Sequence, residues 1–327
     1  MSADIKRIAV LTSGGDAPGM NAAVRAVVRT ASSLDLHVYG IRRGYEGMID
    51  GDIFRLERRD VGNIIHRGGT ILKTARSERF KSKAGRKAAY ESLLAHDIDA
   101  VVAIGGNGTF TGATKFEKEY DIPFIGIPGT IDNDLYGTDF TIGFDTSVNT
   151  AIEAMDRIRD TADSHNRLFF VEVMGRNSGF IALNTAIGSG AESVLIPEVE
   201  MPVERLVELL RKSAKRNKLF SMVVVAEGNK TGGASEIAAK VKGQLDMFDI
   251  KVAIIGHLQR GGAPSSADRV LASRLGHSAV LALVEGKKNL MVGIENYKIS
   301  FTPFEQAISM AKPINEDLLR MAETLAI

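Results

Sequence analysis

Glycine-rich strings follow short apolar segments at three places, and this arrangement limits the fold more than any other feature of the sequence. The strings are RIAVLTSGGDAPGMN at 7–21, VVAIGGNGTFTGA at 101–113 and FIGIPGTIDND at 124–134. The apolar parts do not alternate with polar residues, which predicts strands buried on both faces. In parallel α/β sheets, ligands bind beside the loops at the carboxyl ends of the strands. The three loops together therefore predict a phosphate-binding site.

The same alternation of strands and helices continues along the chain. Further strands are expected at 38–41, 168–173, 194–196, 222–226 and 252–255, and helices at 20–33, 109–120, 145–161, 203–216, 235–241, 267–285 and 315–326. Asp145 is expected to be the N-cap of its helix. At roughly 150 residues per domain, 327 residues suggest two domains. The predicted fold class is therefore α/β, with two doubly wound, Rossmann-like, three-layer α/β/α domains and largely parallel sheets.

Composition excludes several classes of function. Lys and Arg number 41 against 40 Asp and Glu, so the net charge is only +1, and this argues against a nucleic-acid or anionic-membrane partner. The absence of cysteine excludes disulfides, thiolate catalysis and Cys-ligated metal centres. No apolar stretch approaches 18 residues, so neither a secretory nor a membrane segment is expected. The sequence predicts a cytoplasmic protein.

The first two glycine loops favour phosphate binding without matching a standard fingerprint. Gly14 and Gly19 have the spacing of a P-loop, but Met20 and Asn21 stand where that motif needs Lys and Ser or Thr. The G-x-G-x-x-G fingerprint is not met either, which argues against a nicotinamide-dependent dehydrogenase. The glycines could instead form only tight turns. The second loop, 105–109, leaves the backbone open to a polyphosphate, with Thr109 expected to start a helix.

The third loop carries the residues best suited to catalysis. Asp132 and Asp134 follow Thr130, and two carboxylates beside a hydroxyl suit phosphoryl transfer to an alcohol. An Asx-rich turn is the structural alternative. Four arginines at the ends of elements suit recognition of phosphate oxygens, although each alone could be a solvated surface charge. They are Arg76, Arg167, Arg176 and Arg260.

Eight strings, in this order and across almost the whole chain, closely resemble bacterial 6-phosphofructokinase. They are GGDAPGMNAA, RGGT, PGTIDND, the DT that begins at Asp145, VEVMGR, PEVE, AEG and GHLQRGG. The resemblance implies transfer of the γ-phosphoryl of ATP to the 1-hydroxyl of fructose 6-phosphate, with Mg²⁺ as cofactor. It also implies an ATP-binding domain of residues 1–142 and 257–306, and a sugar-phosphate-binding domain of residues 143–256 and 307–327.

The same resemblance implies roles for individual residues. Asp132 resembles the general base, with Thr130 beside the substrate and Asp134 and Asn107 near the metal. Arg76 and Arg176 match positions that neutralise the transferring phosphoryl. The ATP contacts would be Gly15, Arg76, Ser77, Gly106, Asn107, Gly108 and Thr109. The sugar-phosphate contacts would be Thr130, Asp132, Met174, Gly175, Arg176, Glu227, His257 and Arg260, with Arg167 and Lys251 from a neighbouring subunit. His257, which follows an apolar run, could instead be a partly buried structural residue.

Sites completed by a neighbouring subunit imply an oligomer, in this family usually a homotetramer. The resemblance also implies an allosteric pocket for ADP or phosphoenolpyruvate. Its residues would be Arg25, Arg29, Arg58, Arg159, Glu192, Arg216 and Lys218. The alternative for these residues is a solvated basic face.

Two positions depart from the family pattern. Asn107 stands where Asp is typical, so the metal site loses a formal charge and we expect a higher Mg²⁺ requirement. Lys251 stands where Arg is common, and it keeps the charge but loses the bidentate fork.

The choice of phosphoryl donor rests on two glycines. Pyrophosphate-dependent members tend to carry Asp and Lys at the positions of Gly108 and Gly129, so the two glycines favour ATP. A pyrophosphate-dependent enzyme and a catalytically weak, sugar-phosphate- or nucleotide-binding regulatory paralogue remain the alternatives.

Overall fold

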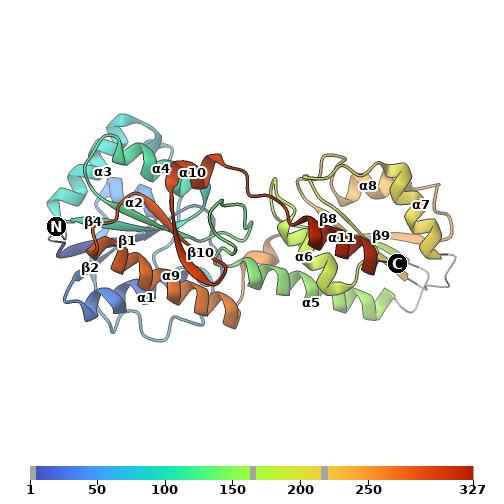
Figure 1. The fold of residues 1–327 in the computed structure, drawn as a ribbon, viewed down its shortest axis with the longest axis horizontal. Coiled ribbons are helices and arrows are strands. Elements are labelled where there is room, and N and C mark those ends of the chain that lie inside the picture. Colours follow the sequence, from blue (N-terminus) through green and yellow to red (C-terminus); the bar gives the residue numbers. More distant parts are fainter. Residues whose placement is uncertain (1–4, 163–166, 215–219, 327) are drawn as a thin grey trace. The chain divides into compact units, whose positions relative to one another are not determined.

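The computed structural model describes residues 5–162, 167–214 and 220–326. The chain forms two compact units. Unit 1 contains residues 1–130, 135–145 and 260–312, and unit 2 contains residues 131–134, 146–259 and 313–327. Each unit is built on its own sheet with helices on both faces (Figure 1). The assignment of ATP to one domain and the sugar phosphate to the other remains a prediction, because backbone packing does not identify a ligand.

Unit 1 holds a seven-stranded sheet with the order β11-β10-β5-β4-β1-β2-β3. The strands are β1 (Arg7–Thr12), β2 (His37–Ile41), β3 (Ile53–Leu56), β4 (Ala100–Gly105), β5 (Phe124–Pro128), β10 (Leu290–Glu295) and β11 (Lys298–Pro303). The central strands pair in parallel, and β3 and β11 pair antiparallel at the two edges. Sequence analysis did not anticipate β3 or the β10–β11 hairpin.

Helices cover both faces of this sheet (Figure 1). They are α1 (Met20–Ser33), α2 (Gly44–Asp50), α3 (Lys83–Ala95), α4 (Asn107–Glu117), α9 (Ser266–Val284) and α10 (Phe304–Ser309), with a short 3-10 helix, η1 (Arg79–Lys81). Helices α1 and α9 pack together where Gly276 permits close approach, since a Cβ there would lie 2.7 Å from the Ala26 Cβ. A core rich in aromatic residues, including Phe110 and Phe116, fills the opposite face.

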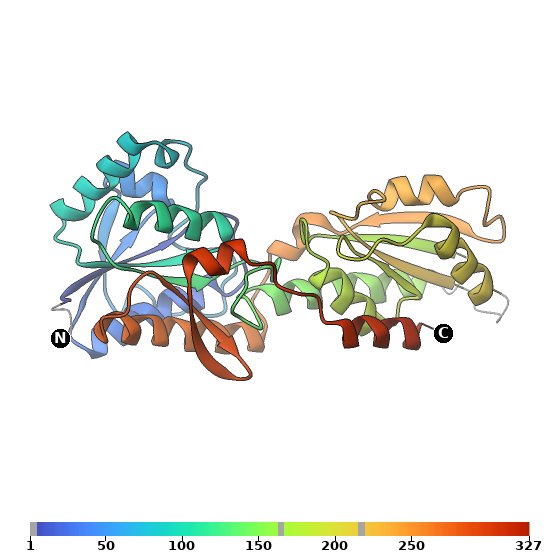
Figure 2. The same ribbon diagram turned by 45° about the horizontal axis from the view of Figure 1, so that its top comes forward.

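Unit 2 holds a four-stranded, all-parallel sheet with the order β7-β8-β6-β9. Its strands are β6 (Arg167–Val173), β7 (Ser193–Leu195), β8 (Phe220–Ala226) and β9 (Asp249–Ile254). Its helices are α5 (Phe144–Ala162), α6 (Phe180–Ser189), α7 (Val203–Ala214), α8 (Ala234–Val241), the 3-10 helix η2 (Gly256–Arg260) and α11 (Glu316–Leu325). Two elements cross the boundary between the units: α5 begins in unit 1, and η2 ends there. Figure 2 shows α11, in dark red, beside α6.

The α/β fold class is confirmed, and two local expectations about helix starts are wrong. Helix α4 begins at Asn107, with Gly106 as its N-cap, so Thr109 lies inside the first turn. Helix α5 begins at Phe144, so Asp145 is a first-turn acid instead of the N-cap. At this position the negative charge of Asp145 is still stabilised by the positive, N-terminal end of the helix dipole. Among the described residues, no helix is both long and apolar enough to cross a membrane.

Candidate active site

In unit 1, hydrogen bonds tie the three glycine-rich loops together at the carboxyl ends of β1, β4 and β5. The Thr109 Oγ1 donates to the carbonyl of Ser13 across 3.1 Å. The Ser13 N–H donates to Ile104, and the Gly129 N–H donates to the carbonyl of Gly105 at 2.9 Å. Parallel strands explain this arrangement, because their carboxyl ends meet at one edge of the sheet.

The glycines of the second loop serve different purposes. A Cβ on Gly105 would lie 2.2 Å from the Thr109 Oγ1 and 2.5 Å from the Ser13 carbonyl oxygen, so close packing requires glycine there. A Cβ on Gly106 would stop 3.4 Å from the Cβ of Thr130, which brings the third loop beside the second. Gly108 is exposed, and no atom of the described residues lies within 4 Å of where its Cβ would be. Protein packing therefore does not require glycine at 108.

The start of α4 completes this part of unit 1. Asn107 is the first residue of the helix, and the buried Tyr45 donates its hydroxyl to the carbonyl of Thr109 across 2.5 Å. Burial raises the pKa of the Tyr45 phenol, so it remains a donor. A fixed helix N-terminus beside open glycine backbone is suited to hold an anion.

The segment with Arg76 and Ser77 is anchored to α2. Ser77 donates its hydroxyl to the Glu46 carboxylate, and this bond, with help from Arg79, lowers the pKa of Glu46. Arg79 also contacts Asp50 at 2.8 Å. Arg76 itself is exposed. An exposed guanidinium on an anchored segment is available to a ligand.

Arg260 lies in unit 1 against the first glycine loop. Its guanidinium donates to the carbonyl of Asp16 at 3.2 Å, and a Cβ on Gly15 would lie 2.9 Å from its Nη1. Sequence analysis grouped Arg260 with the sugar-phosphate contacts and Gly15 with the ATP contacts, but the structure sets the two residues side by side.

In unit 2, the carboxylate of Asp132 faces Arg176. Asp132 is 1% exposed, and the Nε of Arg176 lies 3.4 Å from its Oδ2. Asn133 and Arg176 both have left-handed backbone conformations, with φ of 53° and 51°. Such strain is held only where the surroundings fix the backbone. Asp132 and Arg176 therefore lie in loops whose backbone is held rigidly.

Hydrogen bonds of Ser178 and Glu227 hold this part of unit 2 in place. The Ser178 hydroxyl lies 2.9 Å from the carbonyl oxygens of both Asp132 and Gly175. The Glu227 carboxylate accepts the N–H groups of Gly175 and Arg176, at 3.2 and 2.7 Å. Ser178 thus joins the loop of Asp132 to the loop of Arg176, and Glu227 fixes the latter.

Gln259 positions Met174 from η2. It is fully buried, accepts the Met174 N–H at 2.8 Å and donates to the Ser147 hydroxyl at 3.2 Å. His257, two residues earlier, is exposed.

Arg167 and Lys251 meet around one carboxylate. The parallel register of β6 and β9 sets Arg167 opposite Asp249, and the Arg167 Nε lies 3.6 Å from the Asp249 carboxylate. The Lys251 Nζ lies 2.9 Å from the same carboxylate and is the main cause of the lowered pKa of Asp249. Two cations around one anion leave a local positive charge where β6 and the edge strand β9 begin.

Comparison with known proteins gives these loops a family. Residues 7–283 match the family model for phosphofructokinase. The ATP-dependent 6-phosphofructokinase of Cytophaga hutchinsonii is 55% identical over 98% of both chains.

The chain belongs to the phosphofructokinase family.

Solved phosphofructokinases share its fold. The structure of phosphofructokinase from Saccharomyces cerevisiae matches with a TM-score of 0.90 and 35% identity, covering 98% of this chain and 48% of the yeast chain. This chain thus spans about half the length of that yeast protein. A pyrophosphate-dependent phosphofructokinase from Marinobacter aquaeolei matches with a TM-score of 0.83 and 26% identity, over 96% of this chain and 86% of that one. The resemblance inferred from the motifs is confirmed.

The expected effector residues of this phosphofructokinase are distributed over both units. Arg25 and Arg29 lie on α1, and Arg58 follows β3. Arg159 lies on α5, where it donates to the carbonyl of Ser189. Glu192 is buried just before β7 and accepts the N–H of Met222. Arg216 and Lys218 lie outside the described residues.

Sequence analysis missed Ser178, Gln259 and Asp249. Ser178 and Gln259 lie within or next to the strings VEVMGR and GHLQRGG, so their neighbourhood was a usable signal. Nothing in the local sequence indicated their partners, because these residues act through contacts far along the chain.

Proposed function

We propose that the chain is an ATP-dependent 6-phosphofructokinase, which transfers the γ-phosphoryl of ATP to the 1-hydroxyl of fructose 6-phosphate and forms fructose 1,6-bisphosphate and ADP. The observation that carries this proposal is that the buried carboxylate of Asp132, in the loop after β5, lies 3.4 Å from the Nε of Arg176, in the loop after β6. The relatives named ATP-dependent 6-phosphofructokinase support it.

The residues divide the chemical work. Asp132 takes the proton from the 1-hydroxyl of the sugar while the oxygen of that hydroxyl attacks the γ-phosphorus and ADP leaves. Thr130 contacts the substrate beside Asp132. Arg176 and Arg76 neutralise the charge on the transferring phosphoryl group. Glu227 and Ser178 keep Arg176 and Asp132 in place. Positioning and charge neutralisation supply most of the rate enhancement in such a reaction.

ATP binds unit 1 at the three joined loops. The open backbone at Gly106 and Gly108 and the N-terminus of α4 accept its phosphates, with Thr109 holding the neighbouring loop. Gly15, Arg76 and Ser77 complete the contacts. The sugar phosphate is held in unit 2 by Met174, Gly175, Arg176 and Glu227, together with His257. The hydrogen bond from Arg260 to the carbonyl of Asp16 favours a role for Arg260 beside the loops that bind ATP.

Mg²⁺ is proposed as the cofactor, held mainly by the substrate phosphates. Among the described residues, no group of three acidic or histidine side chains is arranged to hold a metal. This suits Mg²⁺, which usually takes one or two protein carboxylates and keeps phosphates and waters as its other ligands. Asp134, half-buried, would supply the carboxylate, and Asn107 only a neutral oxygen. Bound Mg²⁺ neutralises the charge that develops on the phosphates. A Mg²⁺ titration of activity in which Asn107→Asp matches the parent would contradict the expected higher requirement.

Regulation is proposed at Arg25 and Arg29. The two guanidiniums lie one helical turn apart, and burial together with repulsion from Arg29 lowers the pKa of Arg25. The Nε of Arg29 is buried without a hydrogen-bond partner among the described residues. An anionic effector, ADP or phosphoenolpyruvate, would reduce the repulsion between the two arginines and would give the buried Nε of Arg29 a hydrogen-bond acceptor. A fructose 6-phosphate saturation curve that neither effector shifts would exclude this role.

The main test is a coupled assay with ATP, Mg²⁺ and fructose 6-phosphate. Asp132→Ser should lower kcat by about 10²–10⁴-fold, the usual contribution of a general base. Asp156→Ser, an exposed position on α5, is the matched control and should keep parental activity. An inactive parent that still binds the ligands would indicate the regulatory paralogue instead, and faster turnover with pyrophosphate would indicate the other donor.

A further inference from the structure

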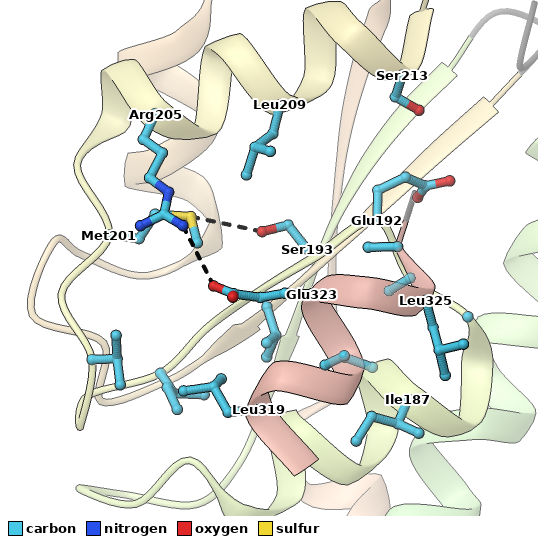
Figure 3. A pocket seen from close by; sticks show the side chains of 18 of the residues that line it. Ile187, Glu192, Ser193, Met201, Arg205, Leu209, Ser213, Leu319, Glu323 and Leu325 are labelled. Atoms are coloured by element: carbon cyan, nitrogen blue, oxygen red, sulfur yellow. Dashed lines mark hydrogen bonds and ion pairs between the residues drawn. The ribbon is translucent and has the colours of Figure 1, made fainter. Parts of the chain in front are cut away.

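Unit 2 contains a cavity between α7 and the C-terminal helix α11 (Figure 3). Its volume is about 460 Å³, and its walls are mainly apolar. The charged side chains of the lining balance, since Arg205 pairs with Glu323 at 3.5 Å and Lys212 is offset by Glu192. The cavity therefore selects neither an anion nor a cation, and its lining does not identify a ligand.

In unit 1, two buried polar side chains stand on either side of the first glycine loop. Thr12, the last residue of β1, is 0% exposed, and Asn21, the second residue of α1, is 1% exposed. Gly14 and Gly15, which lie between them in the chain, are exposed. A buried hydroxyl or amide is costly unless it is hydrogen-bonded, so the partners of Thr12 and Asn21 indicate what these side chains do.

The side chain of Asn21 binds a segment far along the chain. Its amide nitrogen donates to the carbonyls of Arg67 and Gly68, at 3.0 and 3.2 Å, and its amide oxygen accepts the N–H of Ile71 at 2.7 Å. In a P-loop the residue at this position is Ser or Thr, and its hydroxyl binds Mg²⁺. The amide of Asn21 is instead turned toward the protein, where it holds the backbone of this segment.

Thr12 holds the other end of the same segment. Its hydroxyl donates to the carbonyl of Lys73 at 3.0 Å and lies 2.9 Å from the hydroxyl of Thr70. The Arg43 N–H donates to the carbonyl of Leu72 at 2.8 Å, and the Leu72 side chain is fully buried. The segment is therefore anchored at both of its ends.

This anchored segment, residues 67–73, lacks regular structure of its own. The longer stretch 57–78, between β3 and η1, forms neither helix nor strand. Its backbone N–H and C=O groups therefore need partners outside a helix or a sheet. Asn21 and Thr12 supply such partners, so the loss of either side chain would free the backbone of the segment.

The segment 67–73 leads directly to Arg76. The next fixed point of the chain is Ser77, whose hydroxyl donates to the Glu46 carboxylate. Residues 74–76 lie between these two anchored places, and the Arg76 side chain is exposed. The guanidinium of Arg76 therefore extends from a short stretch whose backbone is held on both sides.

We propose that Asn21 and Thr12 are positioning residues, which hold Arg76 where it meets the phosphates of ATP. They act through the backbone of residues 67–73 and do not themselves contact the ligand. Precise placement matters, because a displacement of about 1 Å at a group that contacts the reacting atoms can cost up to about 100-fold in rate. This inference rests on the proposed ATP-dependent function and adds to it the residues that place Arg76.

The test is a double-mutant cycle on the full chain, with ATP affinity measured by calorimetry and kcat by the coupled assay. Asn21→Ser should lower ATP affinity about tenfold, roughly the contribution of one hydrogen bond to a charged group. In an Arg76→Ala background the same substitution should change ATP affinity little, because the side chain that Asn21 positions is gone. Thr12→Val keeps the shape of the side chain without its hydroxyl and should behave in the same way. It supplies the same cycle if Asn21→Ser does not fold.

Thr30→Val is the matched control. Thr30 lies near the C-terminal end of the same helix, is 8% exposed, and its hydroxyl lies 3.1 Å from the His277 ring nitrogen. This substitution should lower the melting temperature and leave ATP affinity unchanged, with or without Arg76.

Two outcomes would overturn the inference alone, in a parent that binds ATP and transfers its phosphoryl group. The first is an additive loss of ATP affinity when Asn21→Ser or Thr12→Val is combined with Arg76→Ala, since a structural role independent of Arg76 predicts additivity. The second is unchanged ATP affinity in both single variants. A parent that binds no ATP or transfers no phosphoryl group would overturn the proposed function and this inference together.

Discussion

At the scale of single residues, glycines of the second and third loops differ in whether protein packing requires them. Gly105 leaves no room for a side chain, whereas Gly108 faces open space. Gly129 is intermediate, since its Cβ would lie 3.0 Å from the Ile104 Cγ2 and 3.1 Å from the Met20 Cε. A long side chain at 129 would meet these neighbours, while one at 108 would meet none of the described residues.

Gly108→Asp should therefore weaken ATP binding without loss of stability. A carboxylate about 4 Å from a phosphate charge costs ~1–4 kcal/mol, so KM for ATP should rise about tenfold or more. Gly108→Asn has nearly the same shape without the charge and should change KM far less. The measurements are KM for ATP and the melting temperature. Equal effects of the two variants would mean that shape, not charge, matters at this position.

Ser178 is a positioning residue for Asp132. Ser178→Ala removes the hydroxyl that joins the carbonyls of Asp132 and Gly175, and the loss of such a bond costs about 0.5–1.5 kcal/mol. We expect kcat to fall by up to about tenfold, with KM for ATP unchanged, because the glycine loops proposed to bind ATP lie in unit 1. Ser221→Ala is the matched control, since Ser221 is fully buried on β8 and its hydroxyl has no hydrogen-bond partner among the described residues. A change in stability with no change in kcat would contradict the positioning role.

At the scale of elements, a charged pair joins α3 to the segment that follows α4. Arg86, nearly buried, donates Nε and Nη2 to the two carboxylate oxygens of Glu119 at 2.8 and 2.6 Å. Arg86 also donates to the carbonyls of Phe80 and Lys81. Because Arg86 is nearly buried, removing the charge of Glu119 would leave its guanidinium without a counter-ion. The pair therefore stabilises the packing of α3 against the segment that follows α4.

Glu119→Gln should lower the free energy of unfolding by about 1.5–3 kcal/mol at neutral pH. Arg86 lowers the pKa of Glu119 in the folded state, so the stabilisation is complete above the unfolded value, about 4.3, and is lost as the pH falls through the lower folded pKa. The difference between parent and variant, measured by urea unfolding, should shrink only below about pH 4. Glu91→Gln removes an exposed pair with Lys87 and should cost little at any pH. A parent–variant difference that does not begin to shrink as the pH falls below about 4 would contradict this account.

At the scale of the whole molecule, Arg167 and Lys251 lead to a prediction about assembly. Their shared carboxylate, Asp249, lies on an edge strand that also exposes Val252 and Ile254, at 39% and 61%. Exposed apolar residues beside a cationic cluster suit an interface through which these residues reach the sugar phosphate of a neighbouring subunit. We therefore propose an oligomer, with the homotetramer as the expected form.

Mixed oligomers test this proposal. Asp132→Ser and Lys251→Ala should each be nearly inactive alone. When the two are co-expressed, a site-sharing pair with one subunit of each variant would have one intact site of two, whereas a pair of identical variants would have none. Activity should therefore rise well above that of either variant alone, to at most about half that of the parent. Sites made within one subunit would give no recovery. The measurement is the activity of hybrids purified with two different affinity tags.

The sequence by itself determined the fold class, the family and the order of the loops. Strand periodicity, glycine clusters and ordered motifs are local properties of the sequence. They can therefore be recognised without knowledge of the tertiary contacts. Tertiary structure alone decided what those residues touch. It set Arg260 beside Gly15, joined Asp132 to Gly175 through Ser178, paired Arg167 with Lys251 around Asp249, and left a cavity between α7 and α11. These contacts connect segments far apart in the chain, and local patterns carry no information about which distant segment a side chain will meet.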